Sequence, residues 1–172
     1  MDNAASRFFD VCAYLSPRVA AALHGIPAAS AVSAEEIRLR AGMPLVLYIS
    51  GRPVFVDVSG NIGLVAGGQA FIPHPADIHD TFLRLCEYSV HSRQEELRHG
   101  FLTLPGGHRA GLCGTAVYQN GEISTLKELS SVNIRIAREF PGCAAPIMSA
   151  LPMDFSGLLL AGRPGRDRKS VV

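Results

Sequence analysis

Arginines recur on segments whose patterns predict β-strands, and they are the first residues that could do chemistry. A planar guanidinium can donate two parallel hydrogen bonds to phosphate or carboxylate oxygens, so arginines on neighbouring strands suit recognition of an anion. The alternative is that each arginine pairs with a surface carboxylate and only holds a sheet together. The arginines are Arg38, Arg40, Arg109, Arg135 and Arg138. The glutamates available for pairing are Glu36, Glu128 and Glu139.

The end of the chain is the second candidate, because the apolar run LLLAG at 158–162 leads into a glycine-containing loop. A phosphate-binding P-loop also follows a strand, and it needs a second glycine, a lysine and a serine or threonine at fixed positions. Counted from Gly162, those positions hold Asp167, Arg168 and Lys169. Taken alone, this segment therefore favours a strand followed by a basic tail.

The histidines and cysteines show no spacing that is typical of a metal or catalytic site. No two histidines form an HxxxH or HExxH pattern. No two of the four cysteines, Cys12, Cys86, Cys113 and Cys143, form a CxxC pair. A small secreted domain would carry a denser disulfide framework. We therefore expect no metal site, and reduced thiols in a cytosolic protein.

Composition sets the class of protein. The chain has 172 residues, of which 48% are hydrophobic and 18% charged, which argues against disorder. The formal net charge of +1 gives no overall attraction to nucleic acid or to an anionic membrane. The N-terminal residues lack the basic region of a signal peptide, and the apolar runs are far shorter than the roughly 20 residues of a membrane span.

The first half of the chain, which must position Arg38 and Arg40, combines helical and strand patterns. Apolar residues recur every three or four positions over 6–24, which predicts one amphipathic helix or two short ones meeting at Ser16–Pro17. Residues 35–40 alternate between charged and apolar, which predicts a half-buried strand. Two further runs, PLVLYIS and PVFVDVS, predict a hairpin joined by Gly51–Arg52.

The second half returns to helical spacing over 75–99 and ends that region at Gly100. Alternating strands follow, with a tight turn at Asn120–Gly121 because Asn-Gly tolerates positive φ. The last of them covers the NIRIARE stretch, before a short helix in CAAPIMSAL and a buried strand in SGLLLAG. These patterns indicate an α+β fold. The residues expected in its core are Ile37, Leu39, Leu47, Phe82, Leu85, Leu112, Ile134 and Ile136.

Three stretches are distinctive enough, taken as complete segments, to indicate a protein family. They are EEIRLRAGMPL, YSVHSRQEELRHGFLTLPGGHRAGLCGTAVYQNGEI and LKELSSVNIRIARE. With GLLLAGRPG, they closely resemble the stage III sporulation protein AA family over about residues 30–166. The resemblance implies an antiparallel-rich N-terminal domain like that of type II and type IV secretion ATPases, followed by a RecA-like α/β core that uses ATP and Mg²⁺. It also implies a hexameric ring in the mother-cell cytoplasm that acts with membrane proteins of a channel toward the forespore. We expect no nucleic-acid partner.

The sequence departs from that family where the ATPase core should begin. Members carry a P-loop of the GPPGSGKTT type, of which only Gly162, Pro164 and Gly165 match. The final DRKSVV is also what a common sequencing adapter gives when translated. We therefore predict an N-terminal domain over 1–152, the first strand and partial P-loop of a truncated core over 153–166, and adapter-derived residues over 167–172. We expect no catalytic residue and no ATPase activity in this chain.

The resemblance also implies a nucleotide-sensing role for Arg109, Arg135 and Arg138. Arginines on comparable strands of the related secretion ATPases approach the ATP phosphates. Two alternatives stay open: a stand-alone protein- or RNA-binding α+β module without ATPase activity, and an assembly scaffold. Sheets that bind RNA usually expose aromatic rings for stacking, and the stretches HRAGLCGTAVY and NIRIARE offer only Tyr118.

Overall fold

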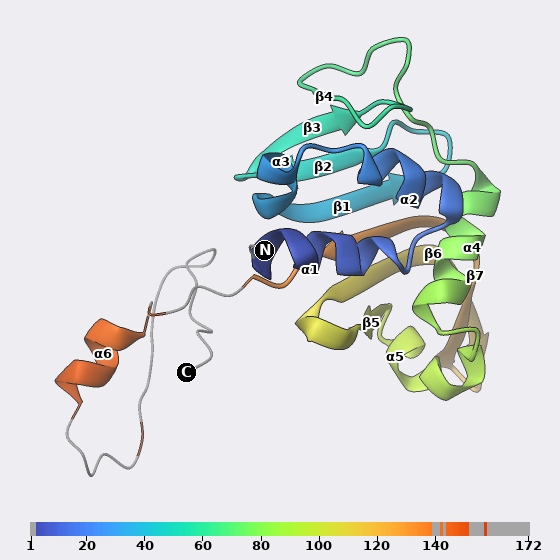
Figure 1. Ribbon diagram of the computed structural model, residues 1–172. Helices are drawn as coiled ribbons and strands as arrows, with labels where there is room; N and C mark the ends of the chain where they lie inside the picture. The colour runs from blue at the N-terminus through green and yellow to red at the C-terminus, as the bar shows by residue number, and fades with distance from the viewer. Residues whose placement is uncertain (1–2, 139–141, 143, 152–156, 158–172) are drawn as a thin grey trace. The chain divides into compact units, whose positions relative to one another are not determined.

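The computed structural model describes residues 3–138, 142, 144–151 and 157 (Figure 1). The chain divides into two units, Met1–Ala137 and Arg138–Val172. The described helix of the second unit is α6 (Ala145–Ala150), where the sequence predicts a short helix. The boundaries expected at residues 152 and 166 lie where the chain is not described, as does most of the predicted SGLLLAG strand, so they stay predictions.

The first unit is built on one seven-stranded antiparallel sheet, which confirms the expected α+β class. The strand order is β4-β3-β2-β1-β7-β6-β5, so β1 pairs with a strand that follows it by about ninety residues of chain. Their bounds are β1 (Ala34–Arg40), β2 (Val46–Ile49), β3 (Arg52–Val56), β4 (Ile62–Gly63), β5 (Phe101–Thr103), β6 (Arg109–Gln119) and β7 (Glu122–Arg135).

Short helices pack against this sheet, and Figure 1 shows α1, α2 and α3 in front of it. The predicted break at Ser16–Pro17 is confirmed, because Ser16 caps a helix that begins at Pro17. The five-residue α3 was not expected, since its AASAV sequence is too short to show a helical period. The bounds are α1 (Asn3–Cys12), α2 (Pro17–His24), α3 (Ala28–Val32), α4 (Pro75–Leu85), η1 (Val90–Arg93), α5 (Gln94–Arg98) and η2 (Pro105–Gly107).

The core lies between the helices and one face of the sheet. Strand alternation places Ile37 opposite Ile134, and Leu39 opposite Val132, on the buried face. The helices contribute side chains such as Phe8 to the same core. Each of the eight residues expected in the core is buried, which confirms the predicted strand registers. The opposite face of the sheet consequently carries the charged residues of β1, β6 and β7.

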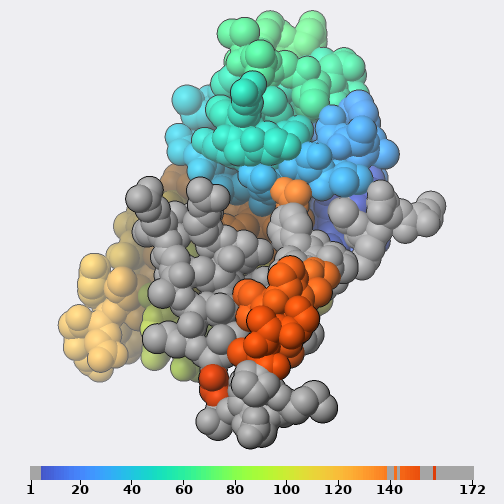
Figure 2. All heavy atoms as spheres, turned by 90° about the vertical axis from the view of Figure 1, so that its left-hand side faces the viewer, coloured from blue at the N-terminus to red at the C-terminus, as the bar shows by residue number. Residues whose placement is uncertain are grey.

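Two tight turns define the hairpins. The β2–β3 turn is Ser50–Gly51, with φ of 49° and 75°, so the prediction of Gly51–Arg52 was one residue late. Arg52 instead begins β3 and pairs with Ile49. The predicted Asn120–Gly121 turn is confirmed, with φ of 54° and 83°. The tip of that β6–β7 hairpin projects at the lower left of Figure 2.

The strand predicted over the NIRIARE stretch was too long at its C-terminal end. β7 ends at Arg135, and Ile136 then donates its N–H to the carbonyl of Glu35 beside β1. Arg138 therefore lies beyond the strand on which it was expected, in the second unit. None of the helices described is long and apolar enough to cross a membrane.

Candidate functional site

The open face of the sheet brings two of the predicted arginines together. In the register of the ladder, Arg109 of β6 lies opposite Arg135 of β7, and Arg135 lies opposite Glu36 of β1. Two residues along each strand, a second row of paired residues runs across the sheet, in which Asn133 of β7 lies between Gly111 of β6 and Arg38 of β1. Side chains two residues apart on one strand share a face, so both rows point away from the core.

Two β-bulges in the β6–β7 hairpin produce this register. A regular ladder continued from the Gln119–Glu122 pair would place Arg109 opposite Val132, a core residue. The register shifts between Val117 and Tyr118 and again between Cys113 and Thr115. The extra residues on β7 bring Arg135 opposite Arg109 and keep charged residues on one face.

A hollow of about 240 Å³ lies at these rows, lined by Glu36, Arg109, Gly111, Asn133 and Arg135. Gly111 leaves space in the hollow because it has no side chain. A Cβ at this position would lie 3.8 Å from the Asn133 carbonyl oxygen, an ordinary contact distance, so the backbone itself does not require glycine here. The two arginines that face each other have like charge, which costs free energy on neighbouring strands unless an anion intervenes. Within the described part of the chain, neither arginine forms an ion pair.

The one carboxylate of the hollow is already in use. Glu36 Oε1 accepts from Arg38 Nε at 2.7 Å, and Arg38 also donates to the Tyr48 hydroxyl at 3.1 Å. The hydrogen bond that Arg38 donates to Glu36 raises the pKa of Arg38. The ion-pair alternative is therefore correct for Arg38. For Arg135, one of the two expected partners is engaged elsewhere, because Glu128 accepts from Thr115 Oγ1 at 3.1 Å, and the other, Glu139, lies outside the described residues.

Arg109 is held by a different contact. Its guanidinium lies over the Phe101 ring of β5, 3.6 Å from the ring centroid. A cation over an aromatic face is attracted by the ring and keeps its hydrogen-bond donors free at the edge. Arg138 follows β7 and belongs to the second unit. Gly162, Pro164 and Gly165 lie outside the described residues.

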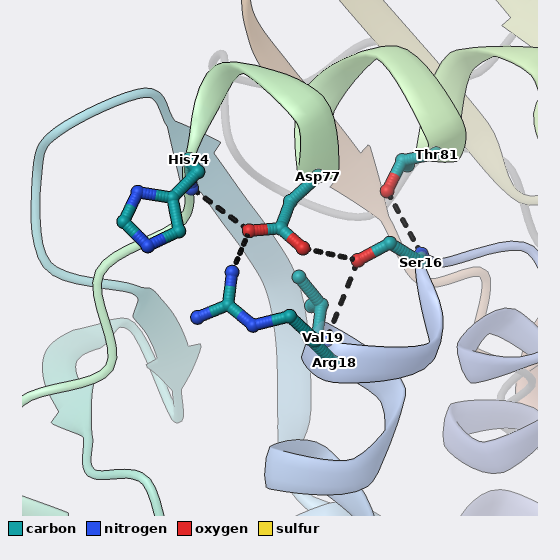
Figure 3. Close-up of polar contacts among 6 residues, drawn as sticks. All are labelled: Ser16, Arg18, Val19, His74, Asp77 and Thr81. Atoms are coloured by element: carbon teal, nitrogen blue, oxygen red, sulfur yellow. Dashed lines mark hydrogen bonds and ion pairs between the residues drawn. The ribbon is translucent and has the colours of Figure 1, made fainter.

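A second polar cluster joins the first turns of α2 and α4 (Figure 3). Asp77 is 5% exposed, and its carboxylate accepts from Ser16 Oγ, from Arg18 and from the His74 backbone N–H. The Ser16 N–H donates to Thr81 Oγ1 at 3.0 Å. Carboxylates and hydroxyls at helix N-termini satisfy free N–H groups, so this cluster stabilises the contact between two helices.

His108 is a buried residue that spacing could not single out, since one histidine forms no pattern. It is 2% exposed, and its Nδ1 accepts the Ala137 N–H at 3.0 Å, at the point where the first unit ends. Burial lowers its pKa, and the charge of Arg7 lowers it further, against a smaller opposite effect of Asp10. Arg7 also donates to the carbonyls of Gly106 and Ala137.

The described residues contain no cluster of histidine, cysteine, aspartate and glutamate that could hold a metal ion. Cys12, Cys86 and Cys113 are free thiols. Burial raises the pKa of Cys12 to about 12 and that of Cys86 to about 11, so neither forms the reactive thiolate at neutral pH.

The open-face residues fall within a segment that known proteins share. The family model described as "Sporulation stage III, protein AA" matches residues 15–156. The chain belongs to the stage III sporulation protein AA family. One curated member, stage III sporulation protein AA of Bacillus subtilis (strain 168), is 33% identical over 152 residues. The match covers 88% of this chain and 45% of that protein. No solved structure matches the chain.

Membership of the stage III sporulation protein AA family confirms the resemblance found in the sequence, and it supports a sporulation-associated function. The chain spans less than half the length of the Bacillus relative, and the arginine hollow lies within the shared part.

Proposed function

We propose that this chain is the N-terminal part of a sporulation-associated ATPase, and that the hollow at Arg109 and Arg135 binds the phosphates of a nucleotide. The observation that supports this most is the pairing of two arginines across neighbouring strands without an acidic partner. An anion between them would convert repulsion into two charge-assisted interactions. The family match supports the sporulation context.

The residues present fit one part of an ATP complex. Two guanidiniums suit phosphate oxygens, and Arg109 keeps its donors available while it rests on Phe101. The carboxylate of Glu36 is engaged by Arg38, so these residues do not offer a Mg²⁺ site. The nucleotide and its Mg²⁺ would therefore be held by a core outside this chain, with the hollow contacting only the phosphate end.

Two arginines near the terminal phosphate can couple chemistry to movement. They would bind a triphosphate more tightly than a diphosphate, so hydrolysis would weaken the contact between the N-terminal domain and the core. We further propose that the full-length protein works as a hexameric ring with membrane proteins of a sporulation channel, in the mother-cell cytoplasm. Arg138 remains a candidate for the same sensing role.

The test uses a full-length family member with an intact P-loop and arginines at the positions matched to Arg109 and Arg135. Each arginine is changed to alanine and to lysine, and ATP turnover and thermal stability are measured. We expect the alanine variants to lose about tenfold or more of their turnover with unchanged stability, and lysine to restore part of it. A change at the position matched to Arg98, an exposed arginine on α5, is the control.

Normal turnover in both alanine variants would overturn the sensing role. If turnover is normal and channel assembly is lost, the sheet face serves the scaffold alternative. Loss of turnover only in a variant at the position of Arg138 would move the sensing role out of the hollow.

A further inference from the structure

A second hollow of about 240 Å³ lies on the open face over β1, β2 and β3, and it differs in chemistry from the first. Its floor consists of two cross-strand pairs, Val46 with Phe55 and Tyr48 with Pro53. Met43, which is 52% exposed, also lines it. The two hollows share no lining residue. The lining residues are Arg38, Arg40, Met43, Pro44, Val46, Tyr48, Pro53 and Phe55.

The local backbone explains why this apolar surface is open. Gly42 has a φ of 73°, a conformation that suits glycine, and lies in the turn that carries the chain from β1 to Met43 and Pro44. Val46, Tyr48 and Phe55 alternate with the buried Leu47 and Val56, so the pleat directs them to the open face. They are half-buried, whereas Leu47 and Val56 on the other face are fully buried.

The charge at this hollow is positive. Arg40 is exposed and forms no ion pair in the described part of the chain, whereas Arg38 is fixed by Glu36 and Tyr48. The first hollow on the same sheet face is lined by two arginines, Arg109 and Arg135, and by one carboxylate, that of Glu36. A binding partner for this face should therefore be acidic, with an apolar group that fits over Val46 and Phe55.

The aromatic contacts favour a peptide over a nucleic acid. Single-stranded RNA binds sheets by stacking bases on free ring faces. Here the guanidinium of Arg38 lies 4.3 Å from the Tyr48 ring centroid, and that of Arg109 covers Phe101. Tyr48 and Phe101 therefore each have one ring face occupied by a guanidinium. Of the two aromatic residues that line this hollow, Tyr48 and Phe55, Phe55 is the one without a described cation contact.

We propose that the hollow formed by Arg40, Met43, Val46 and Phe55 binds an extended acidic segment of a partner protein. An apolar side chain of the segment packs on Val46, Phe55 and Met43, and a neighbouring carboxylate accepts hydrogen bonds from Arg40. This docking role does not depend on ATP binding at the first hollow.

The test measures fluorescence anisotropy of the 172-residue chain with a labelled ten-residue peptide of alternating glutamate and leucine. Matched probes replace leucine by serine, replace glutamate by lysine, or use ten-residue oligouridylate. We expect the Glu/Leu peptide to bind about tenfold or more tightly than each of the other three. Arg40→Glu should weaken that binding about tenfold, and Met43→Ser severalfold, whereas Arg98→Glu should leave it unchanged.

Equal binding of the Glu/Leu and Glu/Ser peptides would overturn the proposal, because the apolar floor would contribute nothing. Tighter binding of oligouridylate would overturn it in favour of a nucleic-acid surface. Arg109→Ala separates this role from the proposed function, since it removes the nucleotide contact and leaves the Arg40 hollow intact. Far-ultraviolet circular dichroism of each variant establishes that a loss of binding is not a loss of fold.

Discussion

Three arginines of the open face, Arg38, Arg109 and Arg135, differ in the contacts that their guanidinium groups make. These contacts determine which hydrogen-bond donors are available to a ligand. Arg38 is fixed by a carboxylate and a hydroxyl, so its donors are used. Arg109 rests on an aromatic ring, which orients the group and leaves its edge free. Arg135 faces Arg109 and has neither contact in the described chain. The anion recognition that we propose therefore falls to the Arg109–Arg135 pair and not to Arg38, whose donors are engaged.

The Arg109–Arg135 pair should lower the stability of the unliganded chain. Because like charges opposite each other repel, we expect Arg135→Ala to raise the free energy of unfolding by a few tenths of a kcal/mol, up to about 0.5. Urea denaturation at low ionic strength measures this, with the exposed Arg98→Ala as control. The gain should shrink at high salt. A clear loss of stability would show that Arg135 has a structural role.

His108 should make the stability of the first unit depend on pH. The neutral ring accepts the Ala137 N–H, and burial with the nearby Arg7 charge lowers its pKa. The unfolded chain binds a proton at the ordinary pKa of about 6.5, whereas the native chain resists it. Native molecules therefore bind fewer protons, so this contribution is complete above about pH 6.5 and is lost as pH falls through the lowered native pKa.

The comparison variant is His108→Gln, whose amide oxygen can still accept the Ala137 N–H but does not titrate. We expect the difference in unfolding free energy between wild type and variant to shift against wild type as pH falls below about 6.5. Thermal melts at pH 8, 7, 6 and 5 measure it. Parallel curves for the two proteins would show that His108 is not the group responsible.

At the scale of elements, alternation and turn chemistry explain most of the fold that was predicted. The strand at 35–40, the helix break at Ser16–Pro17 and the Asn120–Gly121 turn depend on neighbouring residues, and the structure confirms all three. The site was harder to predict because the bulges set its register, and a bulge leaves little trace in sequence. The available signal was Gly114, which lies opposite the bulge and lets the Lys127 carbonyl approach closely.

Gly114 lies between the residues where the β6–β7 register shifts. A Cβ at this position would come within 2.6 Å of the Lys127 carbonyl oxygen, a backbone atom that cannot move aside cheaply. We expect Gly114→Ala to destabilise the chain by about 1–3 kcal/mol. Gly111→Ala on the same strand is the matched control, with an expected change under about 0.5 kcal/mol, since its Cβ has room. Both are measured by urea denaturation, and equal effects would contradict the bulge argument.

Asp77 joins two helices through contacts that the sequence pattern did not reveal. Its removal leaves Ser16 Oγ and the His74 N–H without their acceptor (Figure 3). We expect Asp77→Ala to lower the free energy of unfolding by about 2 kcal/mol, from a lost cap and unsatisfied polar groups. The control is Asp80→Ala on the same helix, whose surface pair with Arg84 should contribute under about 0.5 kcal/mol. Similar losses in both variants would contradict a bridging role for Asp77.

For the whole molecule, the sequence could predict the class of fold but not the strand order. The pairing of β1 with β7 joins segments far apart in the chain, and no local pattern specifies it. Arg38 and Arg135 become neighbours on one face only through that pairing. The family resemblance suggested Arg109, Arg135 and Arg138 as candidates, whereas the sheet shows that Arg109 and Arg135 lie opposite each other.

Every described core residue lies between Phe8 and Ile136, inside the first unit, which predicts that this unit folds without the rest of the chain. A chain ending at residue 152 should therefore unfold cooperatively, with a melting temperature within about 3 °C of the 172-residue chain. That difference corresponds to under roughly 1 kcal/mol for a domain of this size. Calorimetry of both chains at equal concentration measures it.

A chain ending at Leu129 is the negative control, because it lacks Val132 and Ile134, which pair with Leu39 and Ile37. If the 152-residue chain melts well below the full chain, residues after 152 contribute to the stability of the first unit, and the domain boundary must be moved toward the C-terminus.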